Sequence, residues 1–337
     1  MNDFVMKNIA QSVNDAHGAS TYRVRSPVLV IVFNRPHETR AVFDALRAVQ
    51  PKRLYVAADA PRQNKHGESA KCMETLGIFK DVDWPCEVFF KVNDHNLGSH
   101  TTIPQAIDWF FDREEEGIVL EDDCIPSRSF FRYCDELLER YRNDPRIMWI
   151  NGSNVGFKGN DTELTYCFSI YAISWGWASW RRAWAHFNGH YRTTVGRAEL
   201  NDILRRNVGH SIMARLYWRC IFNYAYTIKN WDFRWLNAFW GNGGLACTPT
   251  VNMISNIGFG VAGMHRARRN DPRGHIQAEE VFGDIKGPKK MAPYGILDDF
   301  LNRRLYKIGP FSISKVFLAS RAPWLRNAVR RIQGDAV

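Results

Sequence analysis

Apolar runs of strand length alternate with helical patterns through the first 150 residues, and this rhythm limits the folds open to the chain. Each run ends at polar residues, and apolar residues recur at helical spacing between the runs. Such alternation is typical of a parallel sheet with helices on both faces. We therefore expect an α/β fold with strands at 27–33, 54–58, 88–90, 118–120 and 147–150.

The formal net charge of +10 is unevenly distributed. From residue 295 onward, eight basic residues stand against three acidic ones, which accounts for half of the excess. The rest of the chain is only mildly basic, which argues against a nucleic-acid partner. The basic residues of this last segment are Arg303, Arg304, Lys307, Lys315, Arg321, Arg326, Arg330 and Arg331.

Seven cysteines are scattered without a CxxC pair or zinc-like spacing, which indicates reduced thiols. The first residues lack the apolar run of a signal peptide. No stretch of about 18 apolar residues occurs that would span a membrane. We therefore expect a cytoplasmic protein.

An apolar strand, Ile118–Leu120, runs directly into the carboxylates Glu121, Asp122 and Asp123. Carboxylates at the end of a buried strand are costly unless a cation meets them. A divalent metal with oxygen ligands supplies that cation, and the strand ends of open α/β sheets are where ligands bind. The triplet is therefore a candidate metal–diphosphate site. The alternative interpretation is a solvated acidic turn.

Two common nucleotide motifs are absent. No Gly-x-Gly-x-x-Gly follows the first strand, and the chain has no P-loop. Nucleotide recognition would therefore use the loops after the first and second strands.

Seven short segments complete the pattern. They are, in order, 32–36 (Val-Phe-Asn-Arg-Pro), 57–59 (Ala-Ala-Asp), 96–98 (Asn-Leu-Gly), 120–123 (Leu-Glu-Asp-Asp), 175–180 (Trp-Gly-Trp-Ala-Ser-Trp), 231–232 (Trp-Asp) and 256–265 (Asn-Ile-Gly-Phe-Gly to His). Together they resemble the GT-A nucleotide-sugar glycosyltransferases of bacterial surface-polysaccharide synthesis, and more distantly N-acetylglucosaminyltransferase I.

The resemblance implies a GT-A fold, which is Rossmann-like with a mostly parallel sheet. It also implies transfer of a sugar, with a UDP-sugar as the preferred donor, to a glycan or lipid-linked glycan with the help of Mn²⁺ or Mg²⁺. The expected segments are a loose arm (1–25), a nucleotide-sugar-binding half (26–150), an aromatic-rich acceptor and catalytic half (151–270) and a basic C-terminal helical extension (271–337).

The resemblance also assigns the donor side of the site. Asp123 would meet the metal, and His265 would add to the metal or the pyrophosphate unless it is a surface residue of a basic loop. Asp122 and Glu121 would face the ribose, the donor sugar or a metal-bound water.

Residues after the first two strands would contact the nucleotide. Phe33, Asn34 and Asp59 would lie at the base and ribose, although a helix N-cap also explains Asp59. Arg35 would touch phosphate or pair with Glu38. Asn96 and Gly98 would approach the donor, and Gly98 is equally an ordinary helix-flanking glycine.

Asp232 is the expected general base, because an inverting transfer needs one carboxylate beside the acceptor hydroxyl. Aromatic neighbours would desolvate Asp232 and raise its pKa. A salt bridge with Arg234 or a helix cap is the alternative. Trp175, Trp177 and Trp180, with Trp184, would form an acceptor platform unless they belong to the core.

The C-terminal segment mixes apolar residues with its basic ones. Such a segment predicts peripheral contact with the inner face of a membrane, or else a helical pair packed on the domain. Two other functions stay open. A nucleotidyl- or phosphotransferase would share the acidic site but should carry a Gly-rich loop, and a non-catalytic carbohydrate-binding protein would need neither metal nor base.

Overall fold

The computed structural model describes residues 22–159, 163–188, 196–228, 230–259 and 271–321. Its main sheet has eight strands in the order β3-β2-β1-β4-β8-β6-β9-β7, and a second sheet pairs β10 with β5. The strands are β1 (Val28–Val32), β2 (Arg53–Ala58), β3 (Glu87–Val92), β4 (Glu116–Glu121), β5 (Cys124–Pro126), β6 (Ile147–Asn151), β7 (Tyr166–Ser169), β8 (Trp177–Trp180), β9 (Leu245–Pro249) and β10 (Ile254–Asn256).

The helices alternate with these strands in the first half and gather together in the second. They are α2 (Pro36–Val49), α3 (Glu68–Gly77), α4 (Ser99–Phe111), α5 (Arg128–Tyr141), α6 (Arg181–Asn188), α7 (Arg197–Val208), α8 (Ile212–Ile228), α9 (Trp231–Gly241), α10 (Gly295–Arg304) and α11 (Pro310–Arg321), with 3-10 turns η1 (Ile78–Asp81) and η4 (Pro272–His275).

The expected α/β class is confirmed. All five strands predicted in the first 150 residues are present, and β1 pairs in parallel with both β2 and β4. The sequence pattern missed β8, which lies between β4 and β6 and is antiparallel to both. This strand is the Trp-rich segment, whose residues are buried on both faces of the sheet and so do not alternate between apolar and polar.

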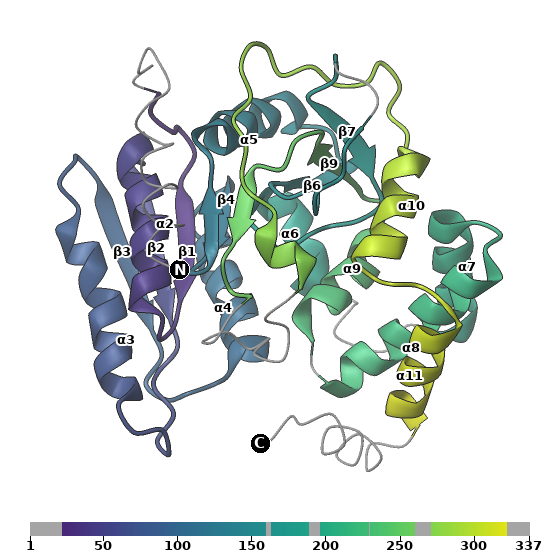
Figure 1. Ribbon diagram of the computed structural model, residues 1–337, viewed down its shortest axis with the longest axis horizontal. Coiled ribbons are helices and arrows are strands. Elements are labelled where there is room, and N and C mark those ends of the chain that lie inside the picture. The colour runs from purple at the N-terminus through teal and green to yellow at the C-terminus, as the bar shows by residue number, and fades with distance from the viewer. Residues whose placement is uncertain (1–21, 160–162, 189–195, 229, 260–270, 322–337) are drawn as a thin grey trace.

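Helices cover both faces of the sheet, because alternate strand residues point to opposite sides. On one face, Val28 and Val30 pack with α2, η1 and α5. On the other, Leu29 and Ile31 pack with α4, α6, α7, α8 and α9. Figure 1 shows β1, β2 and β3 with α2 and α3 at one end of the molecule, and α7, α8, α10 and α11 at the other.

The C-terminal helices pack onto the domain. Leu297 and Leu301 of α10 are buried in the core, and α11 lies along α8 (Figure 1). The packed-pair interpretation therefore applies to this part of the extension. Phe311 on α11 nevertheless remains 74% exposed. Within the described residues, no helix combines the length and the apolar character of a bilayer span.

Candidate active site

The acidic triplet lies where β4 ends, beside the carboxyl end of β1. Ile31 pairs with Glu121 in the parallel ladder, and the Asp122 amide donates to the Ile31 carbonyl at 3.1 Å. The chain leaves β1 through residues 33–35 at this same edge. The structure thus brings the triplet and the loop after the first strand together, as parallel pairing of two strands requires.

Arg35 bridges the two aspartates of the triplet. Its Nη1 donates to Asp122 Oδ1 at 3.0 Å and to Asp123 Oδ2 at 2.6 Å. All three side chains are largely buried, with 16%, 9% and 14% of their surface exposed. Arg35 therefore pairs with the triplet and not with Glu38, the alternative partner expected from the sequence.

The acidic triplet places three buried or partly buried carboxyl groups around one guanidinium. Burial raises the pKa of Glu121 well above its usual range, and the charges of Asp123 and Asp122 raise it further. Burial likewise raises the pKa of Asp122, although Arg35 offsets part of that effect. One guanidinium therefore faces three carboxyl groups in a poorly solvated place, where a second cation would favour their ionised forms.

Asp123 is enclosed by the segment after β10. Its carbonyl accepts from the Ile257 amide at 2.9 Å, and Cys124 Sγ lies 3.5 Å from Asp123 Oδ1 as a donor. A Cβ at position 258 would collide with Asp123 Oδ2. Gly258 is thus required for this close approach, a physical reason for the glycine in the Asn-Ile-Gly-Phe-Gly segment.

The donor set suits a hard divalent ion in part. In the described part of the chain, no group of three His, Cys, Asp or Glu residues is arranged to hold a metal ion. Asp122 and Asp123 are adjacent carboxylates, and Mg²⁺ or Mn²⁺ needs only one or two of these when water and phosphate oxygens complete its shell. These two aspartates therefore fit such an ion as a partial ligand set. His265 lies outside the described residues.

Asp232 enters the same region from α9. Its charge contributes to raising the pKa of Glu121, which places it near the triplet. Burial raises the pKa of Asp232 itself to about 6, against an amide hydrogen bond from Phe233 that lowers it. The α9 N-cap is Asn230, whose side chain accepts from the Phe233 amide at 3.0 Å, so the expected capping alternative for Asp232 is wrong.

Asp59 has a structural role that the sequence did not indicate. Its carboxylate accepts from five donors that tie down the loop before α4, namely Ala60 N, Asn93 Nδ2, Asn96 Nδ2, Leu97 N and Gly98 N. A carboxylate has about four lone-pair sites, so none remains for a ribose hydroxyl. These donors leave the expected contact of Asp59 with the nucleotide without support, and its N-cap alternative is not realised, because Gly98 is the N-cap of α4.

The loop that Asp59 holds contains the other two predicted donor residues. Asn96 Nδ2 also donates to the Ala60 carbonyl at 2.7 Å. Gly98 has φ +74°, a conformation that favours glycine, and is the N-cap of α4. Both residues therefore shape the loop after β3.

Two residues that sequence analysis missed lie beside Phe33 and Asn34. Asn34 Nδ2 donates to Glu68 at 2.8 Å, and Glu68 forms an ion pair with Arg62. The Arg62 guanidinium lies 5.6 Å from the centre of the Phe33 ring. The polar loop after β2 therefore closes onto the loop after β1. Opposite charges in that loop were the available signal.

The tryptophan platform is wrong for two of its three members. Trp177 and Trp180 are 1% and 2% exposed. Trp177 stacks on Trp149 with ring centres 3.7 Å apart, and Trp180 Nε1 donates to the Leu138 carbonyl. Trp184 is buried too. These side chains form core, because a β-strand in mid-sheet buries both of its faces.

Trp175 differs because it is only partly buried. Trp175 precedes β8, before Gly176, whose positive φ of 60° takes the chain out of the β4–β8 ladder. The Trp175 ring contacts Phe259 edge-on at 5.4 Å. Trp175 therefore packs against the segment that contains Gly258 and encloses Asp123.

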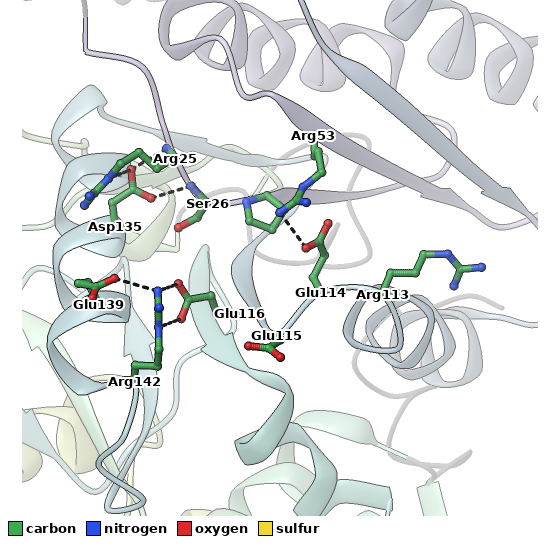
Figure 2. A pocket seen from close by; sticks show the side chains of 11 residues that line it. Arg25, Ser26, Arg53, Arg113, Glu114, Glu115, Glu116, Asp135, Glu139 and Arg142 are labelled. Carbon is green, nitrogen blue, oxygen red and sulfur yellow. Dashed lines mark hydrogen bonds and ion pairs between the residues drawn. The ribbon is translucent and has the colours of Figure 1, made fainter.

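A separate charged pocket of about 430 Å³ lies at the opposite edge of the sheet. Arg53 and Glu116, the first residues of β2 and β4, line it, as Figure 2 shows. Arg53 pairs with Glu114 at 3.0 Å, and Arg142 pairs with Glu116 at 2.7 Å. Because these charges are already paired and lie at the amino ends of the strands, this pocket is not the candidate site.

Comparisons with known proteins give only distant likenesses. No protein-family model and no curated protein sequence matches the chain. Among solved structures, HddC from Yersinia pseudotuberculosis is similar over 47% of this chain and 77% of its own, at 10% identity and a TM-score of 0.29.

Two further structures are similar at the same level. A 4-diphosphocytidyl-2C-methyl-D-erythritol synthase from Anaerococcus prevotii covers 51% of this chain and 78% of its own, at 8% identity and a TM-score of 0.31. A protein assigned as a glucose-1-phosphate thymidylyltransferase, from Bacillus anthracis and in complex with sucrose, covers 78% and 99%, at 9% identity and a TM-score of 0.34.

Proposed function

We propose that the protein is a metal-dependent glycosyltransferase that moves a sugar from a nucleoside-diphosphate donor, preferably a UDP-sugar, to a glycan or lipid-linked glycan. The observation that carries this proposal is the meeting of two carboxylate sets. Asp232 comes from α9, and its charge acts on Glu121 at the end of β4. Sugar transfer needs a base for the acceptor beside a cation site for the leaving diphosphate.

The donor would lie at the carboxyl ends of β1 and β4. Asp122 and Asp123 would hold Mn²⁺ or Mg²⁺, which when bound supplies Lewis-acid neutralisation of the diphosphate. Phe33 and Asn34 would border the nucleoside, under the loop that Arg62 and Glu68 close. Asp59, with Asn96 and Gly98, would keep that side of the pocket in shape.

Asp232 would take the proton of the acceptor hydroxyl. With a pKa of about 6 it is ionised at neutral pH and is a stronger base than an ordinary aspartate. A single base of this kind suits transfer with inversion. Trp175 would provide one aromatic face for the acceptor sugar, beside the segment that encloses Asp123.

The C-terminal helices favour a lipid-linked acceptor. Phe311 is exposed on α11, next to a segment that contains exposed Arg303, Arg304 and Lys307. Exposed aromatic and basic residues together suit the surface of an anionic membrane. Flotation with phosphatidylglycerol vesicles, compared with phosphatidylcholine vesicles, tests this part of the proposal.

The reaction products separate sugar transfer from nucleotidyl transfer. A glycosyltransferase releases a nucleoside diphosphate from a sugar nucleotide. A nucleotidyltransferase joins a nucleoside triphosphate to a sugar phosphate and releases inorganic pyrophosphate from the triphosphate. A thermal-shift screen of UDP, GDP, CMP and dTDP ligands, with and without Mn²⁺, selects the donor, and assay of these two products follows. Pyrophosphate release without sugar transfer would contradict the proposal.

A further inference from the structure

Among the described residues, Arg35 supplies the charged side chain that contacts both aspartates of the triplet. Each of the four carboxylate oxygens has a partner. Asp122 Oδ2 accepts from the Phe33 amide at 3.3 Å, and Asp123 Oδ1 accepts from Cys124 Sγ. The other two oxygens accept from Arg35 Nη1.

The oxygen that Arg35 holds most closely has little free space elsewhere. Asp123 Oδ2 lies 2.6 Å from Arg35 Nη1, and on another side it touches the Gly258 backbone so closely that a Cβ there would collide with it. A metal ion at this oxygen would therefore occupy the position of the guanidinium. The two cations exclude one another.

The Arg35 backbone is fixed while its side chain is long. The Arg35 carbonyl accepts from the Thr39 amide at 2.9 Å, and Pro36 begins α2 directly after it. The start of α2 carries no side-chain cap. Rotation of the Arg35 side chain can therefore carry its charge away from the aspartates and leave the backbone in place. The start of α2, next to Arg35, favours an anion such as a phosphate.

We propose that Arg35 is an internal counter-ion that occupies the cation position of Asp122 and Asp123 in the donor-free protein and transfers to the donor diphosphate when metal and donor bind. The metal then takes the carboxylates, and the guanidinium takes the phosphate oxygens, a pairing that suits its geometry. This inference rests on the proposed function for the identity of the diphosphate.

One consequence is that metal and nucleotide bind cooperatively. Metal alone must break two charge-assisted hydrogen bonds and leave Arg35 poorly solvated beside a second cation. Metal together with a nucleoside diphosphate gives Arg35 a new anionic partner. Mn²⁺ alone should therefore bind weakly, and UDP should raise its affinity.

Titration of Mn²⁺ followed by electron paramagnetic resonance, without nucleotide, tests the exchange. Arg35→Gln removes the competing cation, so this variant should bind Mn²⁺ alone at least about tenfold more tightly than the natural protein. At saturating Mn²⁺ the same variant should bind UDP about tenfold more weakly, because it lacks the phosphate contact. Arg40→Gln is the matched control. It removes the same charge from α2, where Arg40 pairs with Asp81 on the surface, and it should change neither affinity.

Arg35→Lys keeps the charge, and thereby folding, but offers one point of contact in place of a planar fork. It should bind Mn²⁺ alone more tightly than the natural protein and less tightly than Arg35→Gln. Mn²⁺ affinity that is the same in the natural protein, Arg35→Gln and Arg35→Lys would overturn the counter-ion proposal. Sugar transfer is a separate readout, since its absence alongside the expected Mn²⁺ affinities would reject the proposed function and leave the exchange standing.

Discussion

The charge of Asp232, in the first turn of α9, contributes to raising the pKa of Glu121 at the end of β4. Burial places both groups where ionisation is unfavourable. Under the proposed function, this arrangement would let one edge of the sheet hold a departing anion and an acceptor base together. It also makes the two functions separable by mutation.

Asp232→Asn should abolish most transfer without preventing donor binding. The amide keeps the size of the side chain but cannot accept the hydroxyl proton, so we expect kcat to fall by about 10²- to 10⁴-fold. Affinity for UDP with Mn²⁺, measured by calorimetry, should change less than about threefold. A variant that retains full kcat would exclude Asp232 as the base.

The rate should depend on pH through Asp232. A raised pKa means that the carboxyl holds its proton below about pH 6 and cannot accept another. We therefore expect kcat/KM to fall about tenfold per pH unit below that value and to level off above it. Asp298→Asn is the control, because this buried carboxyl pairs with Ser169 on β7. Its removal should leave the fall of kcat/KM at acidic pH unchanged. A flat profile from pH 5 to 8 would argue against a titrating base.

Asp123→Ala should eliminate Mn²⁺-dependent binding of UDP. It removes one of two adjacent carboxylates and releases Arg35 from its shorter contact. A thermal-shift titration with UDP, with and without Mn²⁺, measures the loss. Asp83→Ala removes an exposed carboxylate that pairs with Arg47 and should behave as the natural protein does. If Asp123→Ala retained metal-dependent binding of UDP, the metal would have to bind at residues other than Asp123.

Much of the first half of the fold was predictable because β1, β2 and β4 are mostly buried on both faces and end at polar residues. β1 and β4 show this pattern, and the triplet was located from it. β8 was not predictable in the same way, because its tryptophans indicate a binding platform as readily as a core strand. Only the neighbours of the strand in the sheet decide between these two.

The site residues divide along a similar line. The association of Asp122 and Asp123 with the end of β1 follows from strand order. The use of Asp59 to hold the loop before α4, and of Arg35 to bridge the aspartates, depends on side-chain geometry that no local pattern contains. The sequence therefore predicted which strand ends carry the charged residues, while the side-chain partners of those residues were not predicted.

Gly258→Ala should damage the site rather than the fold. The added methyl collides with Asp123 Oδ2, so the carboxylate must shift away from Arg35 and any bound ion. We expect Mn²⁺-dependent UDP affinity to fall at least about tenfold, with a smaller effect on thermal unfolding. Gly77→Ala, where a Cβ meets nothing within 4 Å, is the control and should affect neither. Unchanged nucleotide affinity in Gly258→Ala would show that Asp123 can move without consequence.

Trp175→Ala and Trp177→Ala should affect different properties, although the two residues are only two positions apart. The first should change mainly the acceptor KM and the second mainly the stability. Trp177 is fully buried against Trp149, and its truncation should cost about 3–5 kcal/mol of unfolding free energy, measured by urea denaturation. Trp175 is partly exposed and contacts Phe259, so Trp175→Ala should cost about 1 kcal/mol or less of that free energy and mainly raise the acceptor KM. Equal destabilisation by both changes, with an unaltered acceptor KM, would return Trp175 to the core and remove the last tryptophan from the acceptor site.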